Sequence, residues 1–360
     1  MTKRILSILL SLCLGTSLMV GCAPKDHSEE KNNTVTEQDG GESSNLPVLK
    51  VAVMPFLNSV PVKYMVDNKL DEKNGFKIET VYFANGGAMN EALAANQWEV
   101  GTLSAAAVNS LAIYGAYCLA EVQHSEGGIY TLVNKDSQIS KIKGENISYP
   151  EVYGNAETIK GSIIATNTGT VSHLNVIKWI EKFGLTQDDV EIVHMDFPSA
   201  YQALKTGNCD VAALNPPTSY SAEAEGFMIS SSLGNLDVPQ YDSIIASSKT
   251  FNDKSDLLKK YIKAFYEATD ALQADSEMAA QLLYDWYVEN GSEATLEACK
   301  SEIETRPFVT SEEARNIKLG ESVQITAEFW VEQGLLEESK FPEVEKHVND
   351  TLVKEVLSGQ

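Results

Sequence analysis

Short β-branched runs alternate with segments whose apolar residues recur at helical spacing, from residue 48 to residue 246. The runs predict strands, and the segments between them predict amphipathic helices. Strands are expected at 48–54, 76–83, 99–104, 118–123, 129–134, 162–166, 190–195, 209–214, 227–232 and 241–248. Strands that alternate with helices indicate parallel sheets, and the length of the chain indicates one sheet in each of two lobes.

The pattern changes after the last expected strand, because residues 252–360 are almost wholly helical in character. Leu257, Leu258, Tyr261, Ile262 and Phe265 fall on one face at helical spacing. A stripe of this kind predicts a helix that packs against a core.

One segment, residues 143–160, has no regular period. It predicts a long loop or an insertion at the junction of the lobes. Tyr149 and Tyr153 lie on it. Tyrosines on loops often serve only as anchors, but at a junction they can cover a ligand.

The start of the chain has the layout of a secretory signal, which we expect over residues 1–21. Lys3 and Arg4 precede an apolar run, and "LMVGC" resembles the lipobox of bacterial lipoproteins, although Met19 stands where leucine is usual. The resemblance implies that Cys22 is acylated. A short buried helix is the structural alternative, but residues 22–46 are polar and without apolar periodicity, which favours a flexible tether.

Charge and cysteine content exclude several classes of protein. The chain carries 28 Lys and Arg against 51 Asp and Glu, a net charge of -23, which argues against a nucleic-acid partner. No CxxC or Cys/His spacing appears, so the sequence indicates neither a metal site nor a disulfide framework. Cys118 and Cys209 lie in apolar runs and are expected to be small buried side chains, while the state of Cys299 is left open.

The turn after the strand at 162–166 is the strongest candidate site. Residues 168–172 read Thr-Gly-Thr-Val-Ser and open an amphipathic helix. Gly169 would let a ligand approach the backbone, and the amides of Thr170, Val171 and Ser172 would have no partner inside the helix. Those amides and the helix dipole attract an anion or a polarised oxygen. The alternative is that Thr168 or Thr170 only caps the helix. His173 is expected to be a packed or solvent-facing residue and not a catalytic base.

The order of elements from Ile163 to Gly226 resembles the second lobe of the nitrate/sulfonate/taurine group of ABC-transporter substrate-binding proteins. Residues 86–107 resemble the first-lobe segment of that group, and residues 257–283 resemble its C-terminal helices. The resemblance implies a type II periplasmic-binding-protein-like α/β fold with two lobes and hinge strands. Lobe 1 would comprise 47–134 and 246–360, and lobe 2 would comprise 135–245.

The same resemblance implies a ligand clamped between the lobes at the carboxyl ends of strands. Residues at these ends, together with the two loop tyrosines, form the expected site: Phe56, Asn58, Ser104, Ala105, Thr168, Gly169, Thr170, Val171, Ser172, Asn215, Pro216, Tyr149 and Tyr153. The alternatives are ordinary packing for Phe56, and a helix cap with a helix-starting proline for Asn215 and Pro216. Arg306 is the basic residue of interest, although a surface connection between helices is the expected setting for it.

The function implied is that of an extracytoplasmic lipoprotein, a monomer without a cofactor, that delivers a small polar organic solute to an ABC permease. A separate ATPase would supply the energy, since the chain lacks a phosphate-loop motif. A sulfonate-like or taurine-like anion is favoured, and a neutral heteroaromatic vitamin precursor is the alternative. "PFLNSVPV" also resembles the start of chorismate dehydratase, but the lipobox and the tether favour a binding protein over an enzyme.

Overall fold

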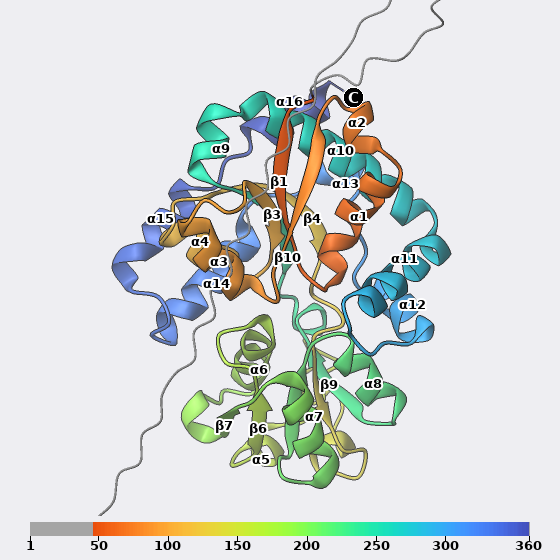
Figure 1. Ribbon diagram of the computed structural model, residues 1–360. Helices are drawn as coiled ribbons and strands as arrows, with labels where there is room; N and C mark the ends of the chain where they lie inside the picture. The colour runs from red at the N-terminus through yellow and green to blue at the C-terminus, as the bar shows by residue number, and fades with distance from the viewer. Residues whose placement is uncertain (1–45, 360) are drawn as a thin grey trace, which may run out of the picture. The chain divides into compact units, whose positions relative to one another are not determined.

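The computed structural model describes residues 46–359. The expected signal peptide at 1–21, the acylated Cys22 and nearly all of the tether at 22–46 lie outside these residues. Within them, every strand expected from the sequence is present, and two five-stranded sheets form (Figure 1).

The first sheet belongs to lobe 1 and has the order β2-β1-β3-β10-β4. Its strands are β1 (Val48–Val53), β2 (Lys77–Tyr82), β3 (Val100–Leu103), β4 (Tyr117–His124) and β10 (Tyr241–Ala246). β10 runs antiparallel to both of its neighbours, while β1 pairs in parallel with β2 and β3. The sheet is therefore mainly parallel, with one strand reversed.

The second sheet belongs to lobe 2 and has the order β7-β6-β8-β5-β9. Its strands are β5 (Tyr130–Val133), β6 (Ile163–Thr166), β7 (Glu191–His194), β8 (Val211–Leu214) and β9 (Met228–Ser232). Here β5 is the reversed strand, antiparallel to β8 and β9. Each sheet thus contains one strand of opposite direction, next to a crossing between the lobes.

The chain crosses between the sheets twice, from β4 to β5 and from β9 to β10. Lobe boundaries were expected after residues 134 and 245, at the far ends of β5 and β10. Sheet membership places the crossings before these strands, at 125–129 and 233–240. An apolar run shows that a strand exists, but not which sheet it joins.

Helices cover both faces of the two sheets, which explains why β3, β5 and β8 are buried along their whole length. Lobe 2 carries α5 (Ala156–Ile159), α6 (Val171–Glu181), α7 (Phe197–Thr206) and α8 (Thr218–Ala224). Lobe 1 carries α1 (Val60–Asp67), α2 (Leu70–Lys73), α3 (Gly86–Ala94), α4 (Ala107–Ala112), α9 (Ser248–Asp253), α10 (Ser255–Ala274), α11 (Ser276–Glu289), α12 (Leu296–Thr305), α13 (Ser311–Ala314), α14 (Glu321–Glu332), α15 (Phe341–Lys346) and α16 (Thr351–Ser358).

The long helix α10 shows how the sequence pattern becomes packing. Leu258, Tyr261, Ile262 and Phe265 are fully buried, and Leu257 is partly buried, as the helical spacing predicted. The same cluster of buried residues contains Leu49, Val51 and Val53 of β1, so α10 covers one face of the first sheet.

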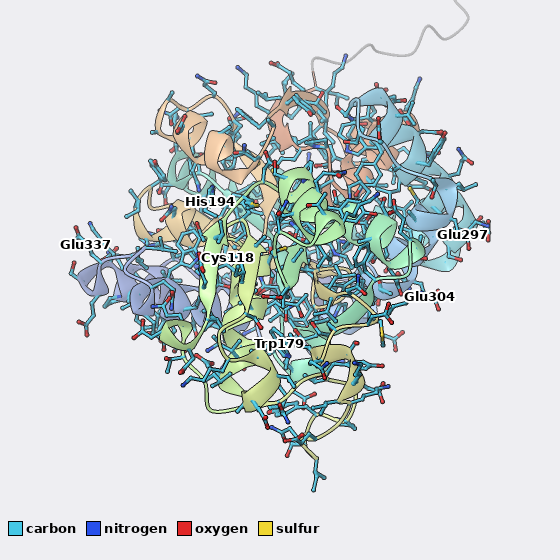
Figure 2. All side chains as sticks on the ribbon, turned by 90° about the horizontal axis from the view of Figure 1, so that it is seen from below. Cys118, Trp179, His194, Glu297, Glu304 and Glu337 are labelled. Carbon is cyan, nitrogen blue, oxygen red and sulfur yellow. The ribbon has the colours of Figure 1, made fainter. Side chains whose placement is uncertain are left out.

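The lobes touch along two helix pairs, α6 against α14 and α8 against α12 (Figure 1). One continuous cluster of buried residues includes Leu103 and Phe329 of lobe 1 together with Val171 and Leu174 of lobe 2. Seen from the side of lobe 2, the exposed carboxylates of Glu297 and Glu337 project on opposite sides of the molecule (Figure 2). Cys118, Cys209 and Cys299 are free and buried, as expected for the first two.

Candidate functional site

The first turn of α6 has backbone donors that no group within the described residues uses. Thr170 stands at the N-cap with an extended backbone, but its hydroxyl donates to the carbonyl of Asn167 at 2.7 Å and does not cap the helix. Within residues 46–359, the amides of Val171, Ser172 and His173 have no hydrogen-bond acceptor. The capping alternative is therefore wrong for the Thr170 side chain, and the turn presents three free N–H groups at the positive end of the helix dipole.

Two neighbouring amides are already occupied. The N–H of Thr168 donates to Nδ1 of His194 at 3.2 Å, and the N–H of Gly169 donates to Nδ1 of His173 at 3.2 Å. Thr168 and Gly169 therefore shape the turn, whereas Val171 and Ser172 offer its donors. Gly169 adopts φ +81°, in the left-handed region that favours glycine.

A second expected segment of lobe 2 joins this turn. The hydroxyl of Ser172 donates to Oδ1 of Asn215 at 2.7 Å. Asn215 follows β8, the neighbour of β6 in the sheet, so the carboxyl ends of two parallel strands bring the pair together. This bond leaves the Nδ2 group of Asn215 available as a further donor.

Lobe 1 reaches the same turn through α14 and the residues after it. The ring of Phe329 lies 5.1 Å from the ring of His173 at an interplanar angle of 74°. Leu335 lies 3.6 Å from the position that a β-carbon on Gly169 would occupy. The start of α6 therefore lies against lobe 1, and no sequence pattern indicated Phe329 or Leu335 in this role.

The expected residues of lobe 1 lie on a separate polar network. Asn58 is buried, and its Nδ2 lies 3.4 Å from Oδ1 of Asp242 and 3.5 Å from the carbonyl of Thr102. Ser104 accepts a hydrogen bond of 3.1 Å from Nε2 of Gln240 in the second crossing.

Two apolar members of the expected set complete the lobe 1 side. Phe56 is partly buried, and Ala105 is buried. Both belong to the cluster of apolar residues that continues into lobe 2.

Arg306 is not on a surface connection, and that expectation is wrong. It is only 8% exposed and donates to Glu302 at 2.9 Å, to the hydroxyl of Ser125 at 3.0 Å and to Asp242 at 3.3 Å. Glu302 lies one helical turn earlier, but Asp242 and Ser125 are distant in sequence, so the local context "ETRPFV" could not show the burial.

In this network one positive side chain, Arg306, pairs with two negative ones, Asp242 and Glu302. Burial raises the pKa of Asp242 and of Glu302, and the guanidinium of Arg306 counteracts that rise. The guanidinium of Arg306 thus pairs with two buried carboxylates, Asp242 beside Asn58 and Glu302 near the end of α12.

Pro216 connects the lobe 2 segment to this network. A β-carbon at Gly128, in the first crossing, would lie 3.2 Å from Cγ of Pro216 and 2.8 Å from Cδ of Arg306. Gly128 adopts φ +71°. The absence of a side chain there lets Pro216 and Arg306 approach from different lobes.

The structure does not bring Tyr149 and Tyr153 together with the turn. The hydroxyl of Tyr149 accepts from Nζ of Lys182 at 2.8 Å, and Lys182 follows the last residue of α6. The carbonyl of Tyr153 accepts from Nε1 of Trp179 at 3.0 Å. An 11-residue helix is about 16 Å long, so both tyrosines lie near the opposite end of α6 from Val171.

Buried polar atoms without a protein partner gather around the strand ends. Such atoms usually face water or a ligand. In the described part of the chain they occur on Thr102 near the end of β3, Gln123 of β4, Thr166 at the end of β6, His173 of α6, Ser219 of α8, Arg306 and Trp330, and also on Tyr261 of α10, away from the strand ends. Two of them adjoin residues of the expected site, since His173 follows Ser172 and Thr102 accepts from Asn58 through its carbonyl.

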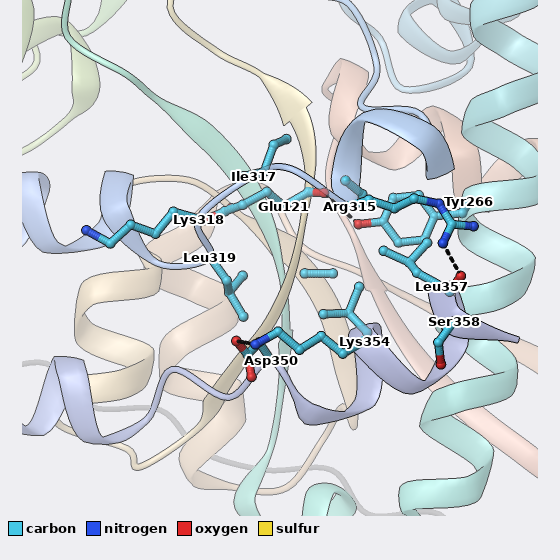
Figure 3. Close-up of a pocket in the computed structure, with 13 residues that line it drawn as sticks. Glu121, Tyr266, Arg315, Ile317, Lys318, Leu319, Asp350, Lys354, Leu357 and Ser358 are labelled. Carbon is cyan, nitrogen blue, oxygen red and sulfur yellow. Dashed lines mark hydrogen bonds and ion pairs between the residues drawn. The ribbon is translucent and has the colours of Figure 1, made fainter.

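Two cavities lie away from the expected residues. One of about 540 Å³ in lobe 1 is bounded by Glu121, Tyr266, Arg315, Lys318 and Lys354, among others (Figure 3). The other, of about 390 Å³, lies beside the first crossing and is bounded by His124, Glu126 and Tyr130, among others. Neither is lined by a residue of the expected site.

Two features are absent from residues 46–359: a group of metal-binding side chains and a helix that could span a membrane. No three side chains among His, Cys, Asp and Glu are grouped so that they could hold a metal ion. No helix in this range combines the length and apolarity that a membrane span requires.

Comparison with known proteins is consistent with the family resemblance noted from the sequence. The model of the NMT1-like family matches residues 42–284. A protein of Brachyspira hyodysenteriae (strain ATCC 49526 / WA1), provisionally named an ABC transporter periplasmic binding protein, is 57% identical over 356 residues and is aligned over 99% of each chain.

Solved structures share the fold at low sequence identity. The periplasmic aliphatic sulphonate binding protein SsuA from Escherichia coli superposes with a TM-score of 0.66 at 19% identity, over 82% of this chain and 91% of that one. The desulfurization enzyme DszB superposes with a TM-score of 0.62 at 14% identity, over 87% of this chain and 99% of that one. The type II binding-protein fold therefore occurs both in a solute-binding protein and in an enzyme.

Proposed function

Because this chain belongs to the NMT1-like family and resembles an ABC-transporter binding protein along nearly its whole length, we propose that it is the substrate-binding component of an ABC importer. It binds a small polar organic solute between the lobes and presents it to a permease, while a separate ATPase supplies the energy. The chain acts as a monomer outside the cytoplasm, held to the membrane by lipid on Cys22.

A small sulfonate-like anion is the solute class we propose. The observation that carries this choice is the first turn of α6, where the amides of Val171, Ser172 and His173 are free and the Thr170 hydroxyl is turned away. Backbone amides at a helix N-terminus bind anionic oxygens without a basic side chain. Arg306 is already engaged by Glu302 and Asp242, which leaves this task to the amides.

The contact set that we propose is smaller than the set expected from the sequence. In lobe 2 it consists of Thr170, Val171, Ser172, Asn215 and Pro216, with Thr168 and Gly169 shaping the turn. In lobe 1 it consists of Phe56, Asn58, Ser104 and Ala105. We leave out Tyr149 and Tyr153, because their contacts lie near the far end of α6.

A proline at Val171 tests the amides directly. Val171 is the first residue of α6, where proline is favoured, and the extended backbone of Thr170 suits a residue that precedes proline. Val171→Pro therefore removes one N–H and keeps the helix, whereas Val171→Ala also replaces the buried valine side chain but keeps the N–H. Gly169 is a poorer position for this test, because φ +81° is incompatible with proline.

The measurement is calorimetric titration of the whole chain, purified in detergent, with taurine, alkanesulfonates, nitrate and pyrimidines. Loss of one hydrogen bond to a charged group weakens binding by roughly tenfold or more, so we expect Val171→Pro to bind a sulfonate at least tenfold more weakly than Val171→Ala. Equal affinities of the two variants would contradict the amide assignment. Binding of pyrimidines alone would favour a neutral heteroaromatic solute stacked on Phe56.

An enzymatic function is the second candidate, because DszB shares the fold. The resemblance to chorismate dehydratase covers only the segment around Phe56. A product detected after incubation with any of the tested solutes would favour this candidate. The lipid anchor is tested separately: Cys22→Ala should release the protein from membranes and abolish incorporation of labelled palmitate.

A further inference from the structure

His173 lies in the proposed site, but the contacts proposed above do not account for its ring nitrogens. Its Nδ1 accepts the N–H of Gly169 at 3.2 Å. In the neutral ring one nitrogen accepts and the other donates, so this bond places the hydrogen on Nε2. Burial lowers the pKa of His173 to about 4, and the ring is therefore neutral at ordinary pH.

The Nε2–H group of His173 is buried and has no acceptor among residues 46–359. The residue is 5% exposed, and Nε2 has no hydrogen-bond partner in the described part of the chain. The neighbour on the lobe 1 side is the ring of Phe329, at 5.1 Å and 74°. An aromatic ring is a weak acceptor and replaces an oxygen poorly.

The ring of His173, which carries this donor, lies at the contact between the two lobes. Nδ1 is fixed to the turn at Gly169 in lobe 2, and the same ring packs in a T-shaped contact against Phe329 of α14 in lobe 1. When the lobes separate, water can accept from Nε2. When they close without a solute, the donor is buried without a partner, which is unfavourable.

We propose that the Nε2–H of His173 donates to an oxygen of the solute, and that its burial without an acceptor disfavours closure of the empty protein. This inference rests on the proposed function, since it assigns a further contact to the same site. His173 then has two effects. It adds affinity for a solute that carries an acceptor, and it couples closing of the lobes to the presence of that solute.

Substitution of His173 by asparagine or by glutamine tests the two ring nitrogens separately. In His173→Asn, Oδ1 takes the place of Nδ1 as the acceptor for Gly169, and no donor remains at the Nε2 position. In His173→Gln, the Nε2 amide restores a donor near that position. The pair therefore distinguishes loss of the donor from general disturbance of α6.

Closure is measured by single-molecule Förster resonance energy transfer between dyes attached to the cysteines of a Glu157→Cys/Glu337→Cys double variant. Both positions are exposed, one in lobe 2 and one in lobe 1, and the native Cys118, Cys209 and Cys299 are buried. Affinity is measured by calorimetry with the sulfonate that binds the wild type best.

We expect His173→Asn to bind that sulfonate at least tenfold more weakly and, without solute, to populate the closed state more than the wild type does. His173→Gln should keep the affinity within about threefold, as for a replaced hydrogen bond of similar strength, and should keep the wild-type distribution. Unchanged affinity and unchanged closure in His173→Asn would overturn the inference. A wild type that binds none of the solutes would contradict the proposed function, while the closure measurement would still decide the role of His173.

A measurement on the wild type covers the case in which His173→Asn does not fold. The proton on Nε2 of His173 should move downfield in the NMR spectrum when the sulfonate is added, because it then gains a hydrogen bond to a charged oxygen. An unshifted resonance at saturating sulfonate would overturn the inference.

Discussion

Ser172 donates a hydrogen bond of 2.7 Å to Asn215, and this bond joins the first turn of α6 to the segment that follows β8. The two residues lie at the carboxyl ends of neighbouring parallel strands. Ser172 is fully buried, so the bond also fixes the direction in which the amide group of Asn215 points.

Ser172→Ala should therefore weaken solute binding by a factor of about ten, since the Asn215 amide loses its orientation. The free energy of unfolding should fall by about 1 kcal/mol, as for one neutral hydrogen bond. Calorimetry and urea unfolding measure the two effects. Ser221→Ala is the matched control, because its hydroxyl donates at 3.3 Å to a carbonyl on the exposed side of α8, and it should change neither quantity.

Arg306→Met should destabilise the fold strongly at neutral pH. The substitution leaves Asp242 and Glu302 buried without a cation, and breaking a buried pair in this way costs roughly 3–5 kcal/mol. The loss should diminish as the pH falls, because the two carboxyls can then take up protons. Arg315→Met is the control, since Arg315 is exposed and, within the described part of the chain, donates only to the carbonyl of Leu357. Equal stability of the two variants at pH 7 would contradict the network.

Glu121→Gln should stabilise the protein at alkaline pH. Burial raises the pKa of Glu121 from 4.5 to about 7, so the folded state holds a proton there that the unfolded state releases as the pH rises above 4.5. The wild type therefore loses stability between pH 4.5 and pH 7, by up to about 3 kcal/mol.

Glutamine stays neutral and can still accept from Gly320 and donate to Ser243, next to the cavity of Figure 3. The melting temperature of Glu121→Gln should exceed that of the wild type at pH 8 and equal it at pH 4.5. Glu304→Gln on the surface is the control and should show no such trend. A uniform difference across the pH range would argue against titration of Glu121.

Gly127→Ala should disturb the first crossing between the lobes. A β-carbon at Gly127 would lie 2.2 Å from the carbonyl oxygen of Thr305, at the end of α12, so the backbone must shift. In the second crossing, a β-carbon at Gly234 would meet its nearest neighbour at 3.5 Å, an ordinary contact. We expect Gly127→Ala to lower the melting temperature and the solute affinity, and Gly234→Ala to keep both. Thermal unfolding and calorimetry of the two variants test this contrast.

The strands and the C-terminal helices were predictable because they follow from local patterns. The β-branched run at 163–166 and the stripe through Leu258, Tyr261 and Phe265 each identify an element without reference to distant residues. The expected lobe boundaries differ from those given by the sheets. The reason is that the sheet to which β5 or β10 belongs depends on pairing with strands that are far away in sequence.

The lobe 2 part of the site was also predictable, since the turn after a strand of a parallel sheet is a general binding position. The partners of that turn were not. His194 accepts a hydrogen bond from the amide of Thr168, and His173 accepts one from the amide of Gly169. Phe329, which packs against His173, belongs to a helix more than a hundred residues later in the chain. Arg306 looked exposed in sequence because its acceptor Asp242 comes from β10. Contacts of this kind depend on the packing of whole lobes.

The most direct test of the account is a crystal structure of the protein with the solute that binds most tightly in the titrations. We predict that anionic oxygens of the solute lie about 2.7–3.2 Å from the backbone nitrogens of Val171 and Ser172, between α6 and lobe 1. A solute bound elsewhere, for example in the cavity beside Glu121, with these two amides still free, would contradict the central claim.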